Sequence, residues 1–437
     1  MESRFRERIG GPWGQLAVRS HTLFPPILLL ILLSALTYSL GYFLDFSCVA
    51  DGWADPMRYM HLCYSDIPAL YVERGFSDNV IPYLQSAGNG SYLEYPVITG
   101  AFMFVAATMT GLVQDSYPDS FRAFFDVNVV LLFIPFVVTV IATALTTQKL
   151  RGQPMQAAMV VFAPTMILAA TINWDLIPIA LVSLALLAWS HDRFTLTGAF
   201  LGLAIAAKFY PIVLLIGFFL LAWRKREWKP TRQLVVATFI AFLAVNIPFA
   251  VANFAGWSFF YRFNFDRAVD FGSLWFAITQ IGLPGIPETA LNVIATASFV
   301  VLLIGIALLV KKAPNTPTIY QVLFLVLAAF VVTNKVYSPQ YVLWLVPLAV
   351  LARPNWRDFI IWQVGELSYF AAIWWFLAGY GVEDFKGLTP EWYAAATFVH
   401  IAATVYFAVM VIRDIQSSVS RNTESNRDVV KRTSALT

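Results

Sequence analysis

Charged residues are scarce in this chain. Only 13% of its 437 residues are Asp, Glu, Lys or Arg, whereas 59% are hydrophobic. A soluble domain carries about 25% charged residues, so this composition excludes an ordinary soluble enzyme. Apolar runs of about 20 residues recur along the chain, and each is long enough to cross a bilayer as a helix. The runs are continuous rather than alternating, which excludes a transmembrane barrel and predicts an all-α polytopic membrane protein.

The chain also has no strong excess of charge of either sign, since the formal net charge is +3. Its basic residues stand in short segments between apolar runs. That pattern orients a protein in the membrane and does not indicate nucleic acid binding. We find no internal repeat and no nucleotide-binding loop.

The first apolar run, residues 23–44, is too long for the hydrophobic region of a cleavable signal peptide. Four arginines precede it, so residues 1–22 are expected to be a cytoplasmic N-terminus. One transmembrane domain is predicted for residues 23–412. The polar remainder, residues 413–437, is predicted to be a disordered cytoplasmic tail.

About 12 transmembrane helices (11–13) are predicted, which places both termini in the cytoplasm. The predicted spans are 23–44, 95–113, 124–147, 156–172, 174–190, 195–222, 233–254, 289–310, 318–333, 341–352, 358–379 and 392–412. Large extracytoplasmic loops follow at about residues 45–94 and 255–288, and the first is expected to carry short juxtamembrane helices.

Two places do not fit this count. Lys149 and Arg151 would lie outside, against the rule that basic residues stay in the cytoplasm. The segment 195–222 contains Lys208 and Pro211 near its middle. Proline removes a helix hydrogen bond, and a lysine within the membrane is costly unless it faces water or a partner. That segment is therefore either one span or two half-helices that meet inside the membrane.

Cysteine is nearly absent, and both cysteines, Cys48 and Cys63, fall in the first loop. In an oxidising compartment this predicts a disulfide that pins the loop, the alternative being two unpaired thiols. A metal site is not predicted, because His61 is the only imidazole nearby.

The first loop is rich in carboxylates: Asp45, Asp51, Asp55, Asp66, Glu73, Asp78 and Glu94. Transfer of a sugar to a hydroxyl needs a general base for the acceptor proton and cations for a phosphate leaving group. Asp66 is the best candidate for the base, the alternative being that it merely caps a helix that starts at Ser65 or Asp66. Glu94 either marks the membrane boundary or binds sugar hydroxyls.

Polar residues inside the predicted spans are candidates for function by default. They include Asp126, Asn128, Asn173, Asp175, Lys208, Glu366 and His400. Asp175 and Lys208 either pair with each other for structural reasons or leave Lys208 free to meet a phosphate. Glu366 and His400 are expected to hold helices together. Further cations on the outer side are Arg262, Arg267 and Lys335, which suit either a phosphate or an interfacial aromatic belt.

The order of several short motifs resembles a known superfamily. They are Asp66, Tyr71, Arg74-Gly75, Pro82-Tyr83, Tyr95-Pro96, Asn173-Trp-Asp175, Lys208-Phe-Tyr-Pro211 and Ser338-Pro339. Over about residues 20–410 the chain looks like the GT-C superfamily of integral-membrane glycosyltransferases. Within it, the chain is similar to glycosyltransferase family 87, the polyprenyl-phosphomannose-dependent mannosyltransferases of actinobacteria.

The resemblance implies transfer of a sugar from polyprenyl phosphate outside the plasma membrane, with no nucleotide sugar, cofactor or essential metal. It implies a hydroxyl of a cell-envelope glycolipid or polysaccharide as acceptor. By position, Asp66 is the catalytic base. The donor phosphate is assigned to Lys208, Arg262, Arg267 and Lys335. Contacts to sugar or acceptor are assigned to Glu94, Tyr95, Asn173, Asp175 and Tyr341.

This chain departs from the family pattern in two places. Gln340-Tyr341 follows Ser338-Pro339, and Glu94 stands where many members have a neutral residue. Both departures leave mannose and arabinofuranose open as the sugar. The alternative functions are a secondary transporter or lipid flippase, and a scaffold for cell-wall enzymes. Transporters usually show related halves, which this sequence does not.

Overall fold

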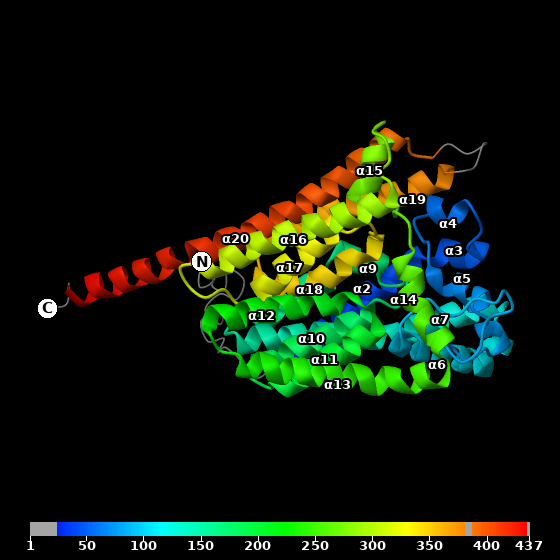
Figure 1. Ribbon diagram of the computed structural model, residues 1–437, viewed down its shortest axis with the longest axis horizontal. Coiled ribbons are helices and arrows are strands. Elements are labelled where there is room, and N and C mark those ends of the chain that lie inside the picture. The colour runs from blue at the N-terminus through cyan, green and yellow to red at the C-terminus, as the bar shows by residue number, and fades with distance from the viewer. Residues whose placement is uncertain (1–23, 381–386, 435–437) are drawn as a thin grey trace, which may run out of the picture.

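The computed structural model describes residues 24–380 and 387–434, and within these ranges the chain forms helices and no strands. Figure 1 shows an elongated bundle. Helices α10 to α13 form its lower part, α16 to α20 form its upper part, and the short helices of the first loop cover the right end. The predicted N-terminus, residues 1–22, lies outside the described residues.

Within the part of the chain that the structure describes, seven helices are long and apolar enough to cross a membrane. They are α2 (Phe24–Leu44), α6 (Val97–Val113), α7 (Ser120–Lys149), α13 (Lys229–Ala252), α16 (Glu288–Lys312), α19 (Trp356–Gly379) and α20 (Pro390–Ser434). Four shorter apolar helices are α10 (Leu176–Ser190), α11 (Phe194–Ala207), α17 (Ile319–Thr333) and α18 (Val342–Ala352). The multi-pass helical architecture is confirmed, whereas the count of twelve spans is not.

Residues 156–172 do not form the single span that the sequence predicts. They form η4 (Pro154–Ala157), α8 (Ala158–Val161) and α9 (Pro164–Ala169). Pro164 begins α9 after an extended Ala163. Because proline lacks an N–H group and disfavours a helical residue before it, Pro164 interrupts the run.

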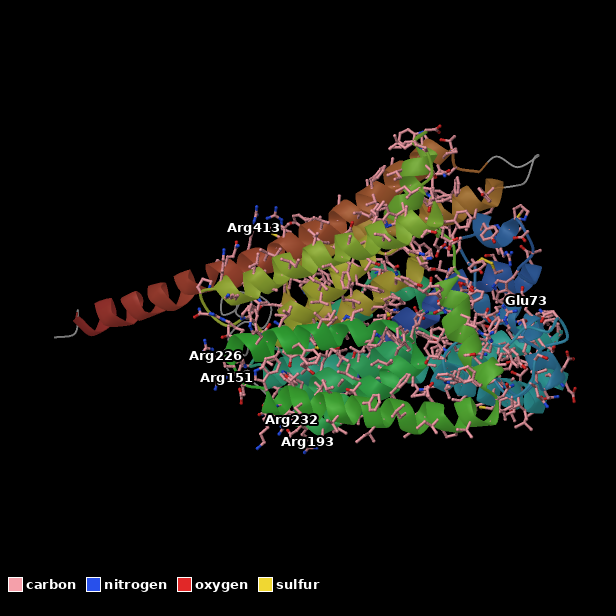
Figure 2. The ribbon with its side chains drawn as sticks, viewed as in Figure 1. Glu73, Arg151, Arg193, Arg226, Arg232 and Arg413 are labelled. Carbon is pink, nitrogen blue, oxygen red and sulfur yellow. A yellow bond between two sulfur atoms is a disulfide. The ribbon has the colours of Figure 1, made fainter. Side chains whose placement is uncertain are left out.

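The segment 195–222 is also interrupted, at Lys208. α11 ends at Ala207, Lys208 is extended, and η5 (Tyr210–Val213) leads into α12 (Leu214–Lys225). Arg193 and Arg226, which flank the segment, lie at the same end of the molecule (Figure 2). The two half-helices therefore form a hairpin with Lys208 at its tip, and the segment does not cross once.

Basic residues gather at one end of the bundle. Figure 2 shows Arg151, Arg193, Arg226, Arg232 and Arg413 at the left end, opposite Glu73. We call the end that carries these arginines the basic end. Arg151 lies there with the other arginines, so the conflict that the twelve-span count created at this residue disappears.

The path of the chain before α7 differs from the one that the predicted spans give. Tyr42 bonds to Asp126 and Tyr38 to Val129, so α2 and α7 run antiparallel. The chain between them, including α6, therefore starts and finishes at the end opposite the basic end.

Short helices occupy both predicted outer loops. The first loop forms α3 (Phe46–Asp51), α4 (Met57–Met60), α5 (Asp66–Glu73) and η2 (Phe76–Asp78), and Cys48 is joined to Cys63 by a disulfide. The second loop forms α14 (Phe254–Phe265) and α15 (Leu274–Gln280). These elements build the outer half of the site described below.

The core lies around α18, in which every residue is buried. α19 and α20 are joined by Glu366, which accepts hydrogen bonds from Trp362 and from Thr404 on α20. His400 lies 3.5 Å from the same carboxylate. α20 continues to Ser434, through the segment for which the sequence predicts a disordered tail.

Candidate active site

A cavity of about 520 Å³ lies beside the short helices of the first loop. Its walls come from α4, α5, the residues before α6, the tip of the α11–α12 hairpin, α14, residues 337–341 and α19. Of the residues predicted for the site, those that line it are Asp66, Glu94, Tyr95, Asn173, Lys208, Arg267 and Tyr341. We call it the central cavity.

Asp66 points into this cavity and does not cap its helix. Ser65 is the N-cap of α5, because its hydroxyl accepts the Ile67 N–H, and it donates to the carbonyl of Thr171. The Asp66 N–H donates to the carbonyl of Ile172. These bonds tie the first turn of α5 to the segment before α10 and leave the Asp66 carboxylate free to face the cavity.

The Asp66 carboxylate accepts hydrogen bonds from two tyrosines. Tyr64 donates to Oδ1 at 2.8 Å and Tyr95 to Oδ2 at 3.4 Å. Burial raises the pKa of Asp66 above its ordinary value, while the bond from Tyr64 and the charge of Lys208 act in the opposite direction. A carboxylate held in this way suits a general base, since a raised pKa makes it a better proton acceptor.

Lys208 enters the cavity from the tip of the α11–α12 hairpin. Its ammonium pairs with Asp175 and lies 5.5 to 5.6 Å from the ring centroids of Tyr95, Tyr341 and Trp344. Trp344 also donates to the other oxygen of Asp175 at 2.8 Å. The pair that the sequence suggests therefore exists, and the lysine nevertheless lines the cavity.

Asp175 does not line the cavity. Its side chain is 2% exposed, beneath Lys208, and its backbone N–H donates to the side chain of Asn173. In this position it holds the lysine rather than touching a sugar. Asn173, in contrast, does reach the cavity wall.

Two further cations line the cavity. Arg267 pairs with Asp270 at 3.1 Å, and Asp270 also accepts a bond from Ser338. Burial raises the pKa of Asp270, and the Arg267 charge opposes this shift. On another wall, Arg58 is bound by both oxygens of Asp55 and lies over the rings of Tyr59 and Tyr64.

The structure does not bring Arg262 and Lys335 to the cavity. Arg262 donates to the carbonyl of Ala255 within its own helix, and Lys335 lies 3.7 Å from Glu288. Glu94 does line the cavity, but Arg74 binds both of its oxygens. A sugar hydroxyl would therefore share Glu94 with an arginine that sequence reasoning did not pair with it.

An apolar groove of about 430 Å³ adjoins the hairpin tip on the outside of the bundle. It is lined by Ile205, Phe209, Ile212, Leu215, Val235, Thr238, Phe239, Phe242, Trp257 and Tyr261, from α11, η5, α12, α13 and α14. Phe209 contacts Phe260, which lines the central cavity, and directly follows Lys208. The groove therefore ends beside the lysine.

Sequence reasoning missed Arg58, Asp270 and Trp374 as parts of this site. Arg58 and Asp270 stand in the two outer loops, where many charged residues offered no way to choose between them. Trp374 lies within an apolar helix, where a tryptophan is unremarkable.

A comparison with protein families finds one match. The family described as glycosyltransferase family 87 matches residues 92–333, more than half of the chain. No curated protein matches the chain. The matched region includes Glu94, Tyr95, Lys208 and Arg267, whereas Asp66 lies before it.

Proposed function

Because the chain belongs to glycosyltransferase family 87, and is thus a multi-pass membrane glycosyltransferase, we propose that it uses a polyprenyl-phosphate sugar as donor. The acceptor is a hydroxyl of a cell-envelope glycolipid or polysaccharide. The observation that carries the proposal is Asp66, a carboxylate aimed into a cavity that also holds Lys208 and Arg267. An apolar groove ends at the same lysine.

In the proposed reaction, Asp66 removes the proton from the acceptor hydroxyl. The acceptor oxygen forms a bond to the anomeric carbon of the sugar while the bond from that carbon to the phosphate oxygen breaks. The electron pair of that bond leaves with polyprenyl phosphate. One carboxylate and one hydroxyl thus suffice for the proton balance, and no oxidant or reductant is needed.

The departing phosphate gains negative charge, which nearby cations stabilise. Lys208 gives one of its three N–H groups to Asp175 and keeps others for phosphate oxygens. Arg267 has five N–H groups, and its bond to Asp270 uses one of them. We assign the phosphate to these two residues and withdraw Arg262 and Lys335, which lie away from the cavity.

The groove supports a lipid-linked donor. Its lining is apolar, and Phe239 on its wall is 62% exposed on the side of the bundle that would face lipid. A polyprenyl chain in this groove would place its phosphate beside Lys208. A nucleotide sugar has no lipid chain that could bind in such a groove, so we propose that no nucleotide sugar is required.

We propose that the site faces the periplasm or cell exterior. The basic end of the bundle should lie in the cytoplasm, and the first loop is at the opposite end (Figure 2). Mannose is the proposed sugar, on the strength of the family resemblance alone.

The test uses full-length protein in lipid nanodiscs with labelled polyprenyl-phosphomannose and a membrane lipid extract. Asp66→Asn keeps the shape of the side chain and removes the base, so transfer should fall by about 10²- to 10⁴-fold. Asp78→Asn changes an exposed carboxylate of the same loop and should leave the rate unchanged. Wild-type rates in Asp66→Asn would remove this residue from the mechanism.

A further inference from the structure

Three aromatic side chains form a cluster on the cavity wall built by α4 and α19. The ring centroids of Tyr59 and Tyr64 are 5.6 Å apart, and those of Tyr64 and Trp374 are 4.8 Å apart. The rings are inclined by only 11° and 27° in these pairs. All three residues line the central cavity. We call them the aromatic cluster.

Arg58 adds hydrogen-bond donors to this cluster. Its guanidinium lies 4.9 Å from the Tyr59 ring centroid and 5.4 Å from that of Tyr64. Two of its five N–H groups are bound by Asp55, at 2.6 and 2.9 Å, which fixes its orientation. The wall therefore combines flat aromatic surfaces with an oriented cation.

Asp66 stands between this wall and the donor side of the cavity. Its Oδ1 is bonded to Tyr64, a member of the cluster, and its Oδ2 to Tyr95, whose ring lies 5.5 Å from the Lys208 ammonium. In Figure 1, α4 and α19 lie above α5, whereas α11 and α13, which bear the apolar groove, lie below it. The base thus has one oxygen toward each side.

We infer that the aromatic cluster and Arg58 form the subsite for the acceptor, and that they bind a pyranose ring of it. This inference rests on the proposed function. The C–H groups on one face of a pyranose pack against an aromatic ring, whose face carries partial negative charge. Arg58 donates hydrogen bonds to ring hydroxyls. The acceptor hydroxyl then meets Asp66 from the Tyr64 side.

The donor sugar does not fit this wall equally well. Its phosphate must stay with the lipid chain, and the apolar groove ends beside Lys208. The donor sugar therefore lies next to Lys208 and Tyr95. The aromatic cluster, on the other side of Asp66, remains for the molecule that gives up its proton.

The experiment measures binding and transfer separately. Wild-type protein, Tyr59→Ala, Tyr59→Phe and Trp374→Ala are placed in lipid nanodiscs without glycoside detergent. Ligand-observed NMR follows binding of methyl α-mannoside, methyl β-glucoside and methyl β-galactoside. Rates with octyl glycosides of the same sugars and labelled polyprenyl-phosphomannose give the half-saturating concentrations of acceptor and donor. Trp356→Ala, an exposed tryptophan at the other end of α19, is the control.

Tyr59→Ala and Trp374→Ala should each weaken glycoside binding, and raise the half-saturating acceptor concentration, by about tenfold. The half-saturating donor concentration should not change, and Tyr59→Phe should restore binding because it keeps the ring. Tyr59 is only partly buried, so its variant should fold even if Trp374→Ala does not.

The inference is overturned if wild-type protein binds none of the methyl glycosides, or if Tyr59→Ala binds and uses them as the wild type does. Glycoside binding that depends on Tyr59, without any transfer from the polyprenyl donor, would instead refute the proposed function and leave a saccharide site. Equal loss of donor and acceptor affinity would also contradict a subsite for the acceptor alone.

Discussion

The ion pair of Lys208 and Asp175 allows the structural role of the lysine to be separated from its role toward phosphate. The two partners differ in burial, because the Asp175 side chain is 2% exposed and that of Lys208 is 18% exposed. Removing either charge leaves the other without its ionic partner. An unpaired Asp175 carboxylate would lie deeper in the protein than an unpaired Lys208 ammonium, which can still reach the water of the cavity.

Lys208→Met should therefore be the more destabilising single change. Loss of one partner of a buried pair costs about 3–5 kcal/mol, and Trp344 alone gives Asp175 a remaining side-chain donor at 2.8 Å. Asp175→Asn should cost less, about 1–2 kcal/mol, because Lys208 stays beside the rings of Tyr95 and Tyr341.

The double variant, Lys208→Met with Asp175→Asn, removes both charges at once. It should lose less stability than the two single changes added together, by a coupling free energy of about 2 kcal/mol between the two sites. Lys208→Met and the double variant should both fail to transfer sugar, because both lack the ammonium that would stabilise the leaving phosphate.

The assay combines denaturant unfolding of the purified protein in detergent with the transfer rate in nanodiscs. Arg262→Met removes a cation that lies outside the cavity and serves as the control for activity. Additive losses of stability in the double variant would refute the buried pair. A double variant that transfers sugar at the wild-type rate would refute the assignment of Lys208 to the phosphate.

Three further predictions concern Asp66, the disulfide of the first loop and the apolar groove. A base works only when deprotonated, so transfer should fall as the pH drops through the raised pKa of Asp66. Tyr64→Phe removes a bond that lowers this pKa and should move the inflection of the rate profile to higher pH; a move to lower pH would contradict the assignment. Cys48→Ser opens a cross-link between residues 15 apart and should cost about 3 kcal/mol of unfolding free energy. Reducing agent should then lower the unfolding midpoint of wild-type protein but not of this variant. Ile212→Trp fills the apolar groove and should raise the half-saturating concentration of a long-chain polyprenyl donor, but not that of a short-chain analogue; equal effects on both donors would exclude the groove.

Part of the candidate site could be predicted from the sequence. A charged side chain among apolar residues is costly in a membrane, so each one indicates a structural or functional role. Lys208 was predicted in this way, whereas Asp66 and Glu94 were chosen within a carboxylate-rich loop by their positions, and all three line one cavity. The choice among outer cations failed for Arg262 and missed Arg58. Charged residues are tolerated at most exposed positions of an outer loop, so the sequence does not show which of them face the cavity.

The fold, like the candidate site, could be predicted only in part from the sequence. Hydropathy located the long helices, but it could not show that α2 and α7 run antiparallel or that Lys208 stands at the tip of a hairpin. A run of apolar residues has the same composition whether it crosses, turns back or stays within the bundle. Proline and lysine in 195–222 signalled an interruption, whereas the direction of the chain after it depends on the packing of α12 against α13 and α17.

The sequence by itself determined that this protein lives in a membrane and that its chemistry is confined to a few polar side chains, because burial of charge in lipid is costly. Only the tertiary structure decided which of those side chains meet. Asp66, Lys208 and Arg267 come from segments up to about 200 residues apart, and helix packing rather than local preference brings them to one cavity. The same packing set the aromatic cluster on one side of the base and the apolar groove on the other.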